Sequence, residues 1–478
     1  MTTLRSKVLS ALAWSGGVRL LGQLFTWGVT LVVMRVLQPA DYGLLAMATV
    51  FVAFLTLMAD IGLGQALVQV DRLDEQRVRQ VFGAIIVVDC LLFTLQYAAA
   101  PAIADFYGEP RLATILRALG ATFLLAIFTS VPTALMSREL DFKRQSLIEF
   151  GSAILGSLTT LTMALLDFGV WALVGGMLVS HACRAIACNV VKPYLQWPRL
   201  SLEGVRGLIL FGGQMTAARL LWFVYSQADM FIAGKLLGKE PLGVYSVAMH
   251  LASLPVQKIS ALANQVAFPA FARANEEGAG VAAGYLLKAV RLLSFFSFPV
   301  LWGLSAAAPE LIAVVLGTKW TAAVLPLQVL ALMMPLRMVG NFVPSATDGI
   351  GRADVGLKNL LVSNAVMLPA FIVGSQSGLY GLCLAWVLAS PLVFLINMRS
   401  SLGVLGMGLP ALLRAMAPPA GCAALMAGAM HLLRLAAPIE SVALRLGVLV
   451  AAGAASYLLL SLLLNRGVLR EILALRRR

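Results

Sequence analysis

The stretch Arg19–Gly43, RLLGQLFTWGVTLVVMRVLQPADYG, has a counterpart at Arg219–Gly243, RLLWFVYSQADMFIAGKLLGKEPLG. Both copies open with an arginine followed by an apolar run. Both close with a basic residue, a turn and a glycine, and they align without a gap. A repeat spaced by 219 − 19 = 200 positions in so apolar a chain predicts a membrane protein that was duplicated from one half.

The composition also predicts a membrane protein. The chain has 478 residues, of which 60% are hydrophobic and 12% are charged, whereas soluble domains carry about 25% charged residues. Apolar runs of about 20 residues recur from end to end, each long enough to cross a hydrocarbon core of roughly 30 Å. The first run follows Arg5 and Lys7. It is too long for a cleaved signal peptide and lacks a cleavage motif, so we expect it to be the first transmembrane helix.

The sequence predicts about fourteen spans, joined by short connections. They lie near residues 11–34, 43–67, 80–104, 112–136, 146–166, 170–191, 207–233, 242–268, 289–308, 321–343, 357–375, 378–398, 411–433 and 442–464. Lys and Arg concentrate in alternate connections, on the side that carries both termini, which predicts that the termini face the cytoplasm. The basic residues expected on the opposite side are few: Arg35, Arg111, Lys235, Lys239, Lys319, Arg434 and Arg445.

Further motifs recur in the same order in both halves. They are Ala100-Pro101 with Ala308-Pro309, Gly108 with Gly317, Val131-Pro132 with Val343-Pro344, and Gly169 with Gly378. Six spans separate equivalent helices, which is an even number, so the two halves should share one orientation. We expect an all-α membrane fold with six-helix lobes at residues 1–195 and 196–405. Residues 406–478 would add helices 13 and 14 and a basic cytoplasmic tail.

Several functional classes find no support in the residues. Five cysteines lie in or beside apolar spans without metal or disulfide spacing, and three histidines are scattered, so we expect no metal site and no cofactor. Topology explains the net charge of +14 better than nucleic-acid binding does. No G-x-x-x-x-G-K-[ST] loop supports ATP hydrolysis. No long extracytoplasmic loop carries a catalytic constellation, so we expect that the protein is not an enzyme.

Arg19 and Arg219 are the first candidate binding residues. Each lies about eight residues into its span, or roughly 12 Å deep at 1.5 Å per residue. An arginine at depth costs at least about 2.5–3.5 kcal/mol and normally faces a cavity; snorkelling to cytoplasmic headgroups is the alternative. Repeat symmetry favours a shared cavity. Two facing guanidiniums repel unless an anion lies between them, and a diphosphate fits their bidentate geometry.

Other polar residues within spans extend this candidate site. Lys258 and Asn264 are expected to line the same cavity. Asp229 lies ten residues beyond Arg219 on the same helix, where it would either bind a coupling cation or pair with Lys258, and the sequence leaves both open. Arg337 is interpreted as an interfacial anchor toward a helix end.

Four segments together resemble a known family. They are PADYG at 39–43, DIGLGQALVQ at 60–69, SRELDF at 137–142 and GTKW at 317–320. In this order, and with this number of spans, they resemble the Wzx-like oligosaccharide flippases. These form the polysaccharide transporter branch of the multidrug/oligosaccharidyl-lipid/polysaccharide (MOP) exporter superfamily. The resemblance covers almost the whole chain.

The resemblance implies two six-helix lobes around a central cationic cavity, with alternating access to either face. It implies a flippase that moves an oligosaccharide on undecaprenyl diphosphate from the cytoplasmic to the periplasmic leaflet of the bacterial inner membrane. The product would serve exopolysaccharide, capsule or O-antigen synthesis. The implied partners are this lipid-linked oligosaccharide, membrane lipid, a polysaccharide polymerase and a chain-length regulator, but no nucleic acid.

Other functions compete with this interpretation. A cation-coupled small-molecule or drug exporter predicts an essential acid such as Asp229 and about twelve spans. A polyprenyl-glycan ligase or polymerase would need catalytic residues in a sizeable extracytoplasmic loop. A structural scaffold gives no reason for paired buried arginines.

Overall fold

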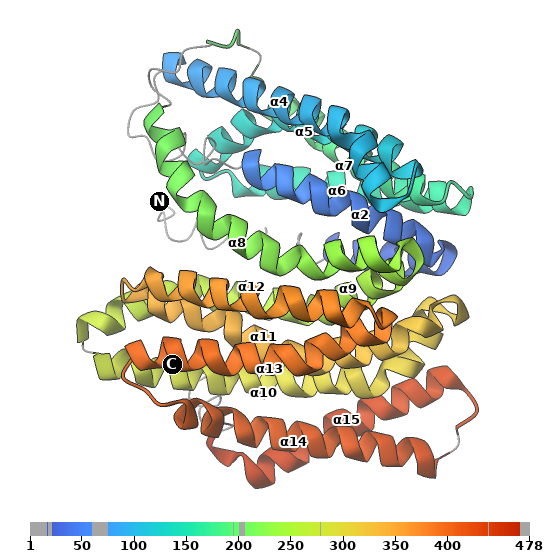
Figure 1. Cartoon of the computed structure of the whole chain (residues 1–478), viewed down its shortest axis with the longest axis vertical. Helices are drawn as coiled ribbons and strands as arrows, with labels where there is room; N and C mark the ends of the chain where they lie inside the picture. Colours follow the sequence, from blue (N-terminus) through green and yellow to red (C-terminus); the bar gives the residue numbers. More distant parts are fainter. Residues whose placement is uncertain are drawn as a thin grey trace, which may run out of the picture. The chain divides into compact units, whose positions relative to one another are not determined.

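A computed structural model describes residues 17, 22–59, 75–194, 196–199, 206–277, 279–437 and 439–468, without the side chains of 77, 206–217, 258 and 260–282. Within these ranges the chain forms helices and no strand (Figure 1), which confirms the predicted all-α class. The helices are α2 (Pro39–Ala59), α4 (Glu75–Tyr107), α5 (Arg111–Arg138), α6 (Phe142–Leu165), α7 (Val170–Val191), α8 (Arg206–Leu237), α9 (Lys239–Glu277), α10 (Ala279–Leu311), α11 (Val324–Gly349), α12 (Ala353–Ser375), α13 (Gly378–Val404), α14 (Leu409–Ala436) and α15 (Val442–Leu464). A further apolar helix covers Gly22–Val36, and the short helices η1 (Ile312–Leu316) and η2 (Thr318–Ala323) join α10 to α11.

Each of the predicted spans overlaps one of these helices. Two predictions, 170–191 and 442–464, coincide with α7 and α15. Among the described residues, 11 helices are long and apolar enough to cross a membrane. The chain is therefore a multi-pass membrane protein.

The helices extend further than hydropathy indicated in the region of α9 and α10. The span predicted at 242–268 belongs to a helix of 39 residues that continues to Glu277, or about 58 Å at 1.5 Å per residue. Arg273 and Lys288, which lie between the predicted spans, are on α9 and α10 instead. Hydropathy marks only the apolar part of a helix, whereas its backbone hydrogen bonds continue into the polar region beyond the hydrocarbon core.

The sequence repeat has a structural counterpart. Pro101 lies inside α4 and Pro309 lies inside α10, each shortly before its helix ends. The repeated glycines that follow, Gly108 and Gly317, both adopt positive φ values, of 72° and 90°. Glycine populates this left-handed region without the steric cost that a Cβ atom brings. The duplicated motifs therefore mark the same type of helix ending in both halves.

The chain divides into two compact units. One comprises residues 1–223 and 238–240, and the other comprises residues 224–237 and 241–478. The extensive helix contacts are α4 with α5 and α6 with α7 in the first unit, and α12 with α13, α10 with α14 and α10 with α11 in the second. Residues 238–240 join the first unit, where Lys239 Nζ donates a hydrogen bond of 2.9 Å to Glu109. The expected lobe boundaries at 195/196 and 405/406 remain predictions.

Helices α12 and α13 approach each other through glycines. A Cβ atom placed on Gly381 would lie 2.0 Å from the carbonyl oxygen of Gly374, and one placed on Gly374 would lie 2.5 Å from the carbonyl oxygen of Gly381. Small residues at such contacts let helix backbones pack closely, which is a main source of helix association in membranes. Neither position has room for a side chain.

We predict that Gly381→Ala lowers the melting temperature of the purified protein, because the added Cβ overlaps backbone that cannot rotate away. Overpacking of this kind typically costs about 1–3 kcal/mol. Gly403→Ala is the matched control on the same helix, since a Cβ there meets nothing within 4 Å. Equal melting temperatures for the two variants would contradict the close α12–α13 contact.

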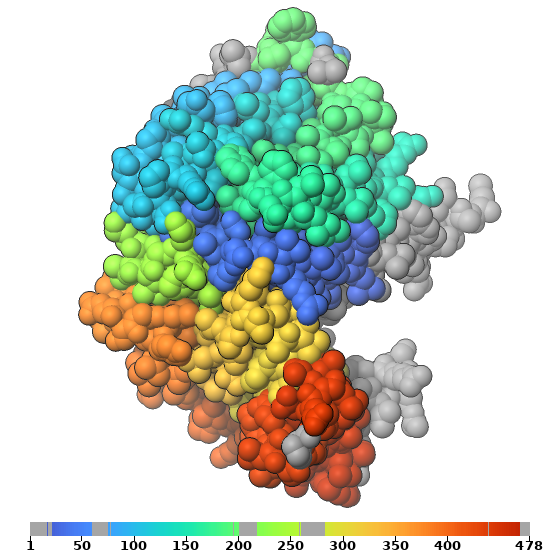
Figure 2. All heavy atoms as spheres, turned by 90° about the vertical axis from the view of Figure 1, so that its right-hand side faces the viewer, coloured from blue at the N-terminus to red at the C-terminus, as the bar shows by residue number. Residues whose placement is uncertain are grey.

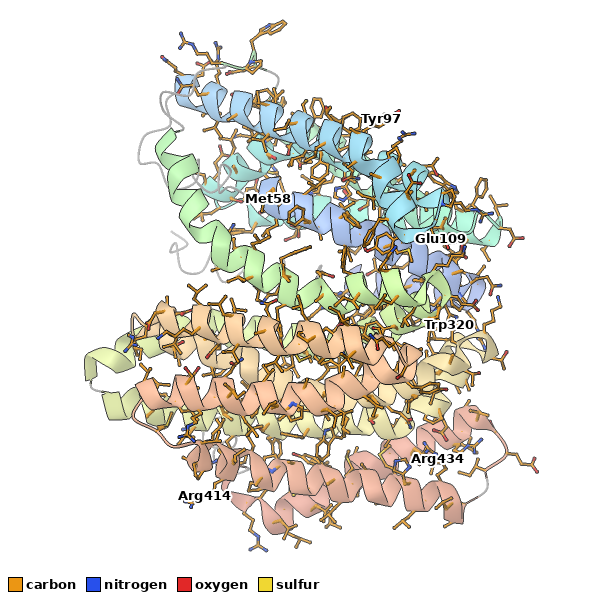
Figure 3. All side chains as sticks on the ribbon, viewed as in Figure 1. Met58, Tyr97, Glu109, Trp320, Arg414 and Arg434 are labelled. Carbon is orange, nitrogen blue, oxygen red and sulfur yellow. The ribbon has the colours of Figure 1, made fainter. Side chains whose placement is uncertain are left out.

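An ion-pair cluster attaches α14 and α15 to α10. The Glu310 carboxylate, whose side chain is only 4% exposed, accepts two hydrogen bonds from Arg434, of 2.8 and 2.6 Å. Arg445 lies 3.8 Å from the same carboxylate. In the space-filling view the red α14–α15 pair adjoins the yellow segment around residue 310 (Figure 2), and Arg434 lies on α14 (Figure 3).

We predict that Glu310→Gln destabilises the protein by about 3 kcal/mol or more, because removing one partner leaves two arginines without their counter-charge. The effect should be largest on α14 and α15, seen as faster proteolysis of the connection at 437–441. Glu440→Gln changes an exposed carboxylate in that connection and should have no effect. Equal proteolysis of both variants would show that the cluster does not hold the helix pair.

Candidate functional site

The structure describes part of the predicted site. Arg19 lies outside the described residues, as do the side chains of Lys258 and Asn264 on α9. Arg219 and Asp229 both lie on α8, Arg219 half-buried and Asp229 only 3% exposed. The convergence of the basic residues on one cavity therefore remains a prediction, whereas the surroundings of Asp229 are known.

Asp229 ends a chain of buried hydrogen bonds in the second unit. The indole Nε1–H of Trp386 on α13 donates to Tyr245 Oη at 2.7 Å. The Tyr245 hydroxyl on α9 donates in turn to Asp229 Oδ2, also at 2.7 Å. Tyr245 is completely buried and Trp386 is 3% exposed. A carboxylate that would be costly to bury alone is thus held by two aromatic donors in series.

A cation completes this cluster. The Arg337 guanidinium on α11 lies 5.3 Å from the centre of the Trp386 ring, within the range of a cation–π interaction. Its positive charge also acts on Asp229. Four helices, α8, α9, α11 and α13, therefore each contribute one side chain to the cluster of Asp229, Tyr245, Trp386 and Arg337.

The position of Arg337 corrects the prediction that it anchors a helix end at the membrane interface. The predicted span ended at residue 343, but α11 continues to Gly349, which places Arg337 near the middle of the helix. Among the described side chains, the cationic neighbour of Asp229 is this arginine. Whether Lys258 also approaches Asp229 stays a prediction, as does the binding of a coupling cation.

Tyr245 and Trp386 were missed because aromatic residues inside apolar runs look like ordinary core residues. One signal was available. Buried tyrosine hydroxyls and tryptophan N–H groups usually find a hydrogen-bond partner, so each predicts a polar neighbour on another helix. The sequence does not reveal which neighbour, since Tyr245 and Trp386 lie 141 residues apart.

Three carboxylates are buried in the described chain, and they differ in their partners. Asp229 accepts hydrogen bonds from Tyr245 and Glu310 accepts them from Arg434. Asp89 on α4 is 5% exposed and has no recorded hydrogen bond or ion pair with any described residue. Ionisable residues inside a membrane segment are rare and commonly functional. Asp89 is therefore a second candidate, in the first unit.

We predict that Tyr245→Phe lowers the free energy of unfolding by about 1–3 kcal/mol, because it removes the side-chain donor to Asp229 Oδ2 and leaves the Trp386 N–H without its acceptor. Thermal unfolding in detergent or nanodiscs would measure this. Tyr380→Phe is the control, since Tyr380 is a 68% exposed residue of α13. A Tyr245→Phe protein as stable as the control would exclude a structural role for the chain of hydrogen bonds.

Comparison with known proteins places the chain among polysaccharide biosynthesis proteins. The family model described as "Polysaccharide biosynthesis protein" matches residues 32–325. The teichuronic acid biosynthesis protein TuaB of Bacillus subtilis (strain 168) is 30% identical over 422 residues, which cover 85% of each chain. The lipopolysaccharide biosynthesis protein WzxC of Escherichia coli (strain K12) is 24% identical over 393 residues, covering 81% of this chain and 79% of that protein.

The fold is shared with a solved transporter structure. The lipid II flippase MurJ, in an inward closed conformation, superposes with a TM-score of 0.74. The superposition covers 94% of this chain and 99% of that chain, at 13% sequence identity. This likeness establishes a common helical fold, while the assignment of function depends on other observations.

Proposed function

From the premise that this chain belongs to the polysaccharide biosynthesis protein family, as a Wzx-like member of the MOP superfamily, we propose that it is a lipid-linked oligosaccharide flippase. Its substrate is an oligosaccharide repeat unit on undecaprenyl diphosphate. The protein moves this unit from the cytoplasmic to the periplasmic leaflet of the bacterial inner membrane. The product enters exopolysaccharide, capsule or O-antigen synthesis.

The observation that carries this proposal is the match to the polysaccharide biosynthesis family over residues 32–325. The relatives TuaB and WzxC are named for the biosynthesis of two different cell-surface polymers. The fold of the lipid II flippase MurJ supports transport of a lipid-linked sugar. A multi-pass helical protein in such a biosynthesis family is suited to carrying a membrane-bound intermediate rather than to synthesising one.

The proposed binding site is a cationic cavity lined by Arg19, Arg219, Lys258 and Asn264. A diphosphate and several sugars cannot cross hydrocarbon unaided, because each polar group that loses its hydrogen bonds costs several kcal/mol. Guanidinium groups replace these bonds for the diphosphate in bidentate geometry. The polyprenyl chain remains in lipid throughout, so only the headgroup needs a polar passage.

The proposed mechanism is alternating access by two six-helix lobes, residues 1–195 and 196–405, with residues 406–478 as an accessory. Both termini face the cytoplasm, and a polymerase and a chain-length regulator act on the product. Asp229 serves either as a coupling-cation ligand or as a member of a structural ion pair. Its hydrogen bond from Tyr245 and the nearby charge of Arg337 support the structural role.

Two observations favour the flippase over the alternatives. Fourteen predicted spans each overlap a described helix, whereas a drug exporter of the related branch predicts about twelve. The ligase or polymerase alternative needs a large extracytoplasmic loop with catalytic residues. The connections between α4 and α7 and between α11 and α14 are short turns, and α10 joins α11 through the short helices η1 and η2. None of these described connections is a large loop, which favours transport over catalysis.

We predict that Arg19→Ala and Arg219→Ala each reduce export of the lipid-linked oligosaccharide by at least about tenfold, since a hydrogen bond to a charged group contributes about 1.5–3 kcal/mol. The double variant should be more impaired than either single one. The measurement is the amount of repeat unit in each leaflet of cells that make the variants. Arg111→Ala, which removes an exposed arginine at the start of α5, is the control.

Membrane levels of all variants must be equal for this comparison. Lipid-linked repeat units that accumulate in the cytoplasmic leaflet would identify the arginines as substrate ligands. Undisturbed export in the double variant would instead identify both residues as snorkelling anchors and remove them from the proposed site.

A further inference from the structure

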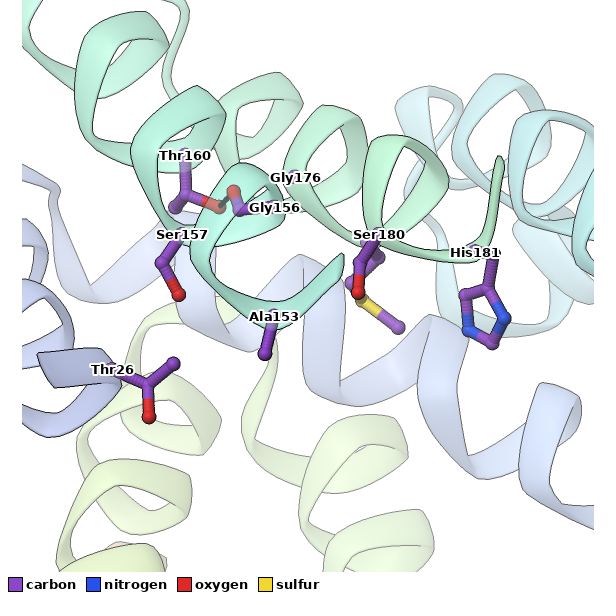
Figure 4. Close-up of a pocket in the computed structure, with 9 residues that line it drawn as sticks. Thr26, Ala153, Gly156, Ser157, Thr160, Gly176, Ser180 and His181 are labelled. Carbon is purple, nitrogen blue, oxygen red and sulfur yellow. Dashed lines mark hydrogen bonds between the residues drawn. The ribbon is translucent and has the colours of Figure 1, made fainter. Parts of the chain in front are cut away.

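The first unit contains an open pocket of about 290 Å³ between the helix Gly22–Val36, α6 and α7. Its polar lining consists of Thr26, Ser157, Thr160, Ser180 and His181. Ser157, Ser180 and His181 project from α6 and α7 on the same side, toward Thr26 (Figure 4). These residues lie on apolar helices, whose other neighbours would be lipid tails or further helices.

Close packing of α6 and α7 creates the hollow. A Cβ atom on Gly176 would lie 1.7 Å from Thr160 Oγ1, and one on Gly156 would lie 2.7 Å from the carbonyl oxygen of Gly176. The two backbones are therefore nearly in contact. Apart from Met177, the side chains of α6 and α7 that line the pocket are small or polar, so large apolar groups leave most of the face toward Thr26 unfilled.

The hydrogen-bonding groups of the pocket are only partly used by the protein. Thr26 and Thr160 donate to carbonyl oxygens of their own helices, at 2.7 and 2.9 Å. Ser157, Ser180 and His181 have no recorded hydrogen bond with any described residue, and His181 is exposed. In hydrocarbon an unsatisfied polar group is costly. This face is therefore adapted to water or to a polar ligand rather than to lipid tails.

The charges around the pocket indicate which kind of polar ligand it suits. None of its described lining residues is Asp, Glu, Lys or Arg. The nearest charged residues along α6 and α7 are Glu149, four residues from Ala153, and Arg184, three residues from His181, and they form a 4.0 Å ion pair with each other. A diphosphate would require cations. Hydroxyl and imidazole groups instead match a neutral ligand that carries many hydroxyls.

We propose that this pocket binds a sugar ring of the transported glycan, with Ser157, Ser180 and His181 as its hydrogen-bonding residues. This assignment depends on the proposed flippase function and adds the glycan subsite to it. The volume is close to the lower end of the roughly 300–1,000 Å³ of ligand pockets, so it accommodates one monosaccharide unit rather than a whole repeat. Ala153 and Met177 supply apolar surface for the C–H faces of the ring.

The test compares three probes on the purified full-length chain in nanodiscs. They are undecaprenyl diphosphate, the lipid-linked oligosaccharide extracted from the producing cells, and the glycan released from that lipid by mild acid. The triple variant Ser157→Ala/Ser180→Ala/His181→Phe should bind the released glycan at least tenfold more weakly than the wild type. It should bind undecaprenyl diphosphate unchanged. Thr159→Ala removes a hydroxyl of α6 that donates to its own helix outside the pocket, and should behave as wild type.

A second variant tests the pocket by changing its volume rather than its hydrogen-bonding groups. Ala153→Leu leaves the three polar residues intact but narrows the pocket, and should weaken binding of the released glycan to a similar extent. Because it alters no hydrogen-bonding group, it keeps the test valid if the triple variant folds poorly.

The outcomes separate the two proposals. If both pocket variants bind the released glycan as the wild type does, the sugar pocket is refuted while the flippase function stands. If they lose undecaprenyl diphosphate instead, the pocket holds the lipid carrier and the sugar assignment is wrong. If the wild type binds none of the three probes, the proposed function fails and the pocket assignment fails with it.

Discussion

The hydrocarbon core of a membrane offers no water to its polar groups, and this constraint underlies the rest of the structure. Helices satisfy it for the backbone, which explains why every long apolar segment of the described chain is helical. Hydroxyl groups satisfy it locally, as Thr26 and Thr94 do by donating to carbonyls of the preceding turn. An ionised carboxylate has no hydrogen to donate to a carbonyl. Asp229 and Glu310 instead accept hydrogen bonds from neighbouring helices.

The cost of an unpaired charge in the membrane also explains the contacts of some basic residues on the side opposite the termini, where the charge distribution predicts few basic residues. Arg434 and Arg445 face the buried carboxylate of Glu310, and Lys239 is paired with Glu109. Lys239 thus has its own counter-charge, whereas the two arginines share one carboxylate, and both contacts stabilise the fold. The Glu310 cluster also explains how α14 and α15, which lie outside the duplicated segments, are attached to the second unit.

Equivalent helix pairs of the two halves have acquired different polar contents. Both α6–α7 and α12–α13 pack closely through small residues. Between α12 and α13, Asn359 donates to Ser401 and Asn397 donates to Ser363, so the polar groups serve helix association. In the pocket beside α6 and α7, by contrast, Ser157, Ser180 and His181 form no hydrogen bond with a described residue. Both helix pairs therefore retain close packing. Their polar side chains differ: those between α12 and α13 bond to one another, whereas those beside α6 and α7 line an open pocket.

The sequence by itself determined the helical class, the positions of the spans, the repeat and the family, because apolar length, charge distribution and motif order are properties of contiguous residues. It underestimated α9 and α11, whose polar ends hydropathy does not mark. It identified Asp229 as a buried acid but not its partners. Only the tertiary structure decided those, bringing Tyr245, Arg337 and Trp386 together from separate helices. Which face of a helix meets which neighbour depends on packing between distant segments, and no local pattern encodes it.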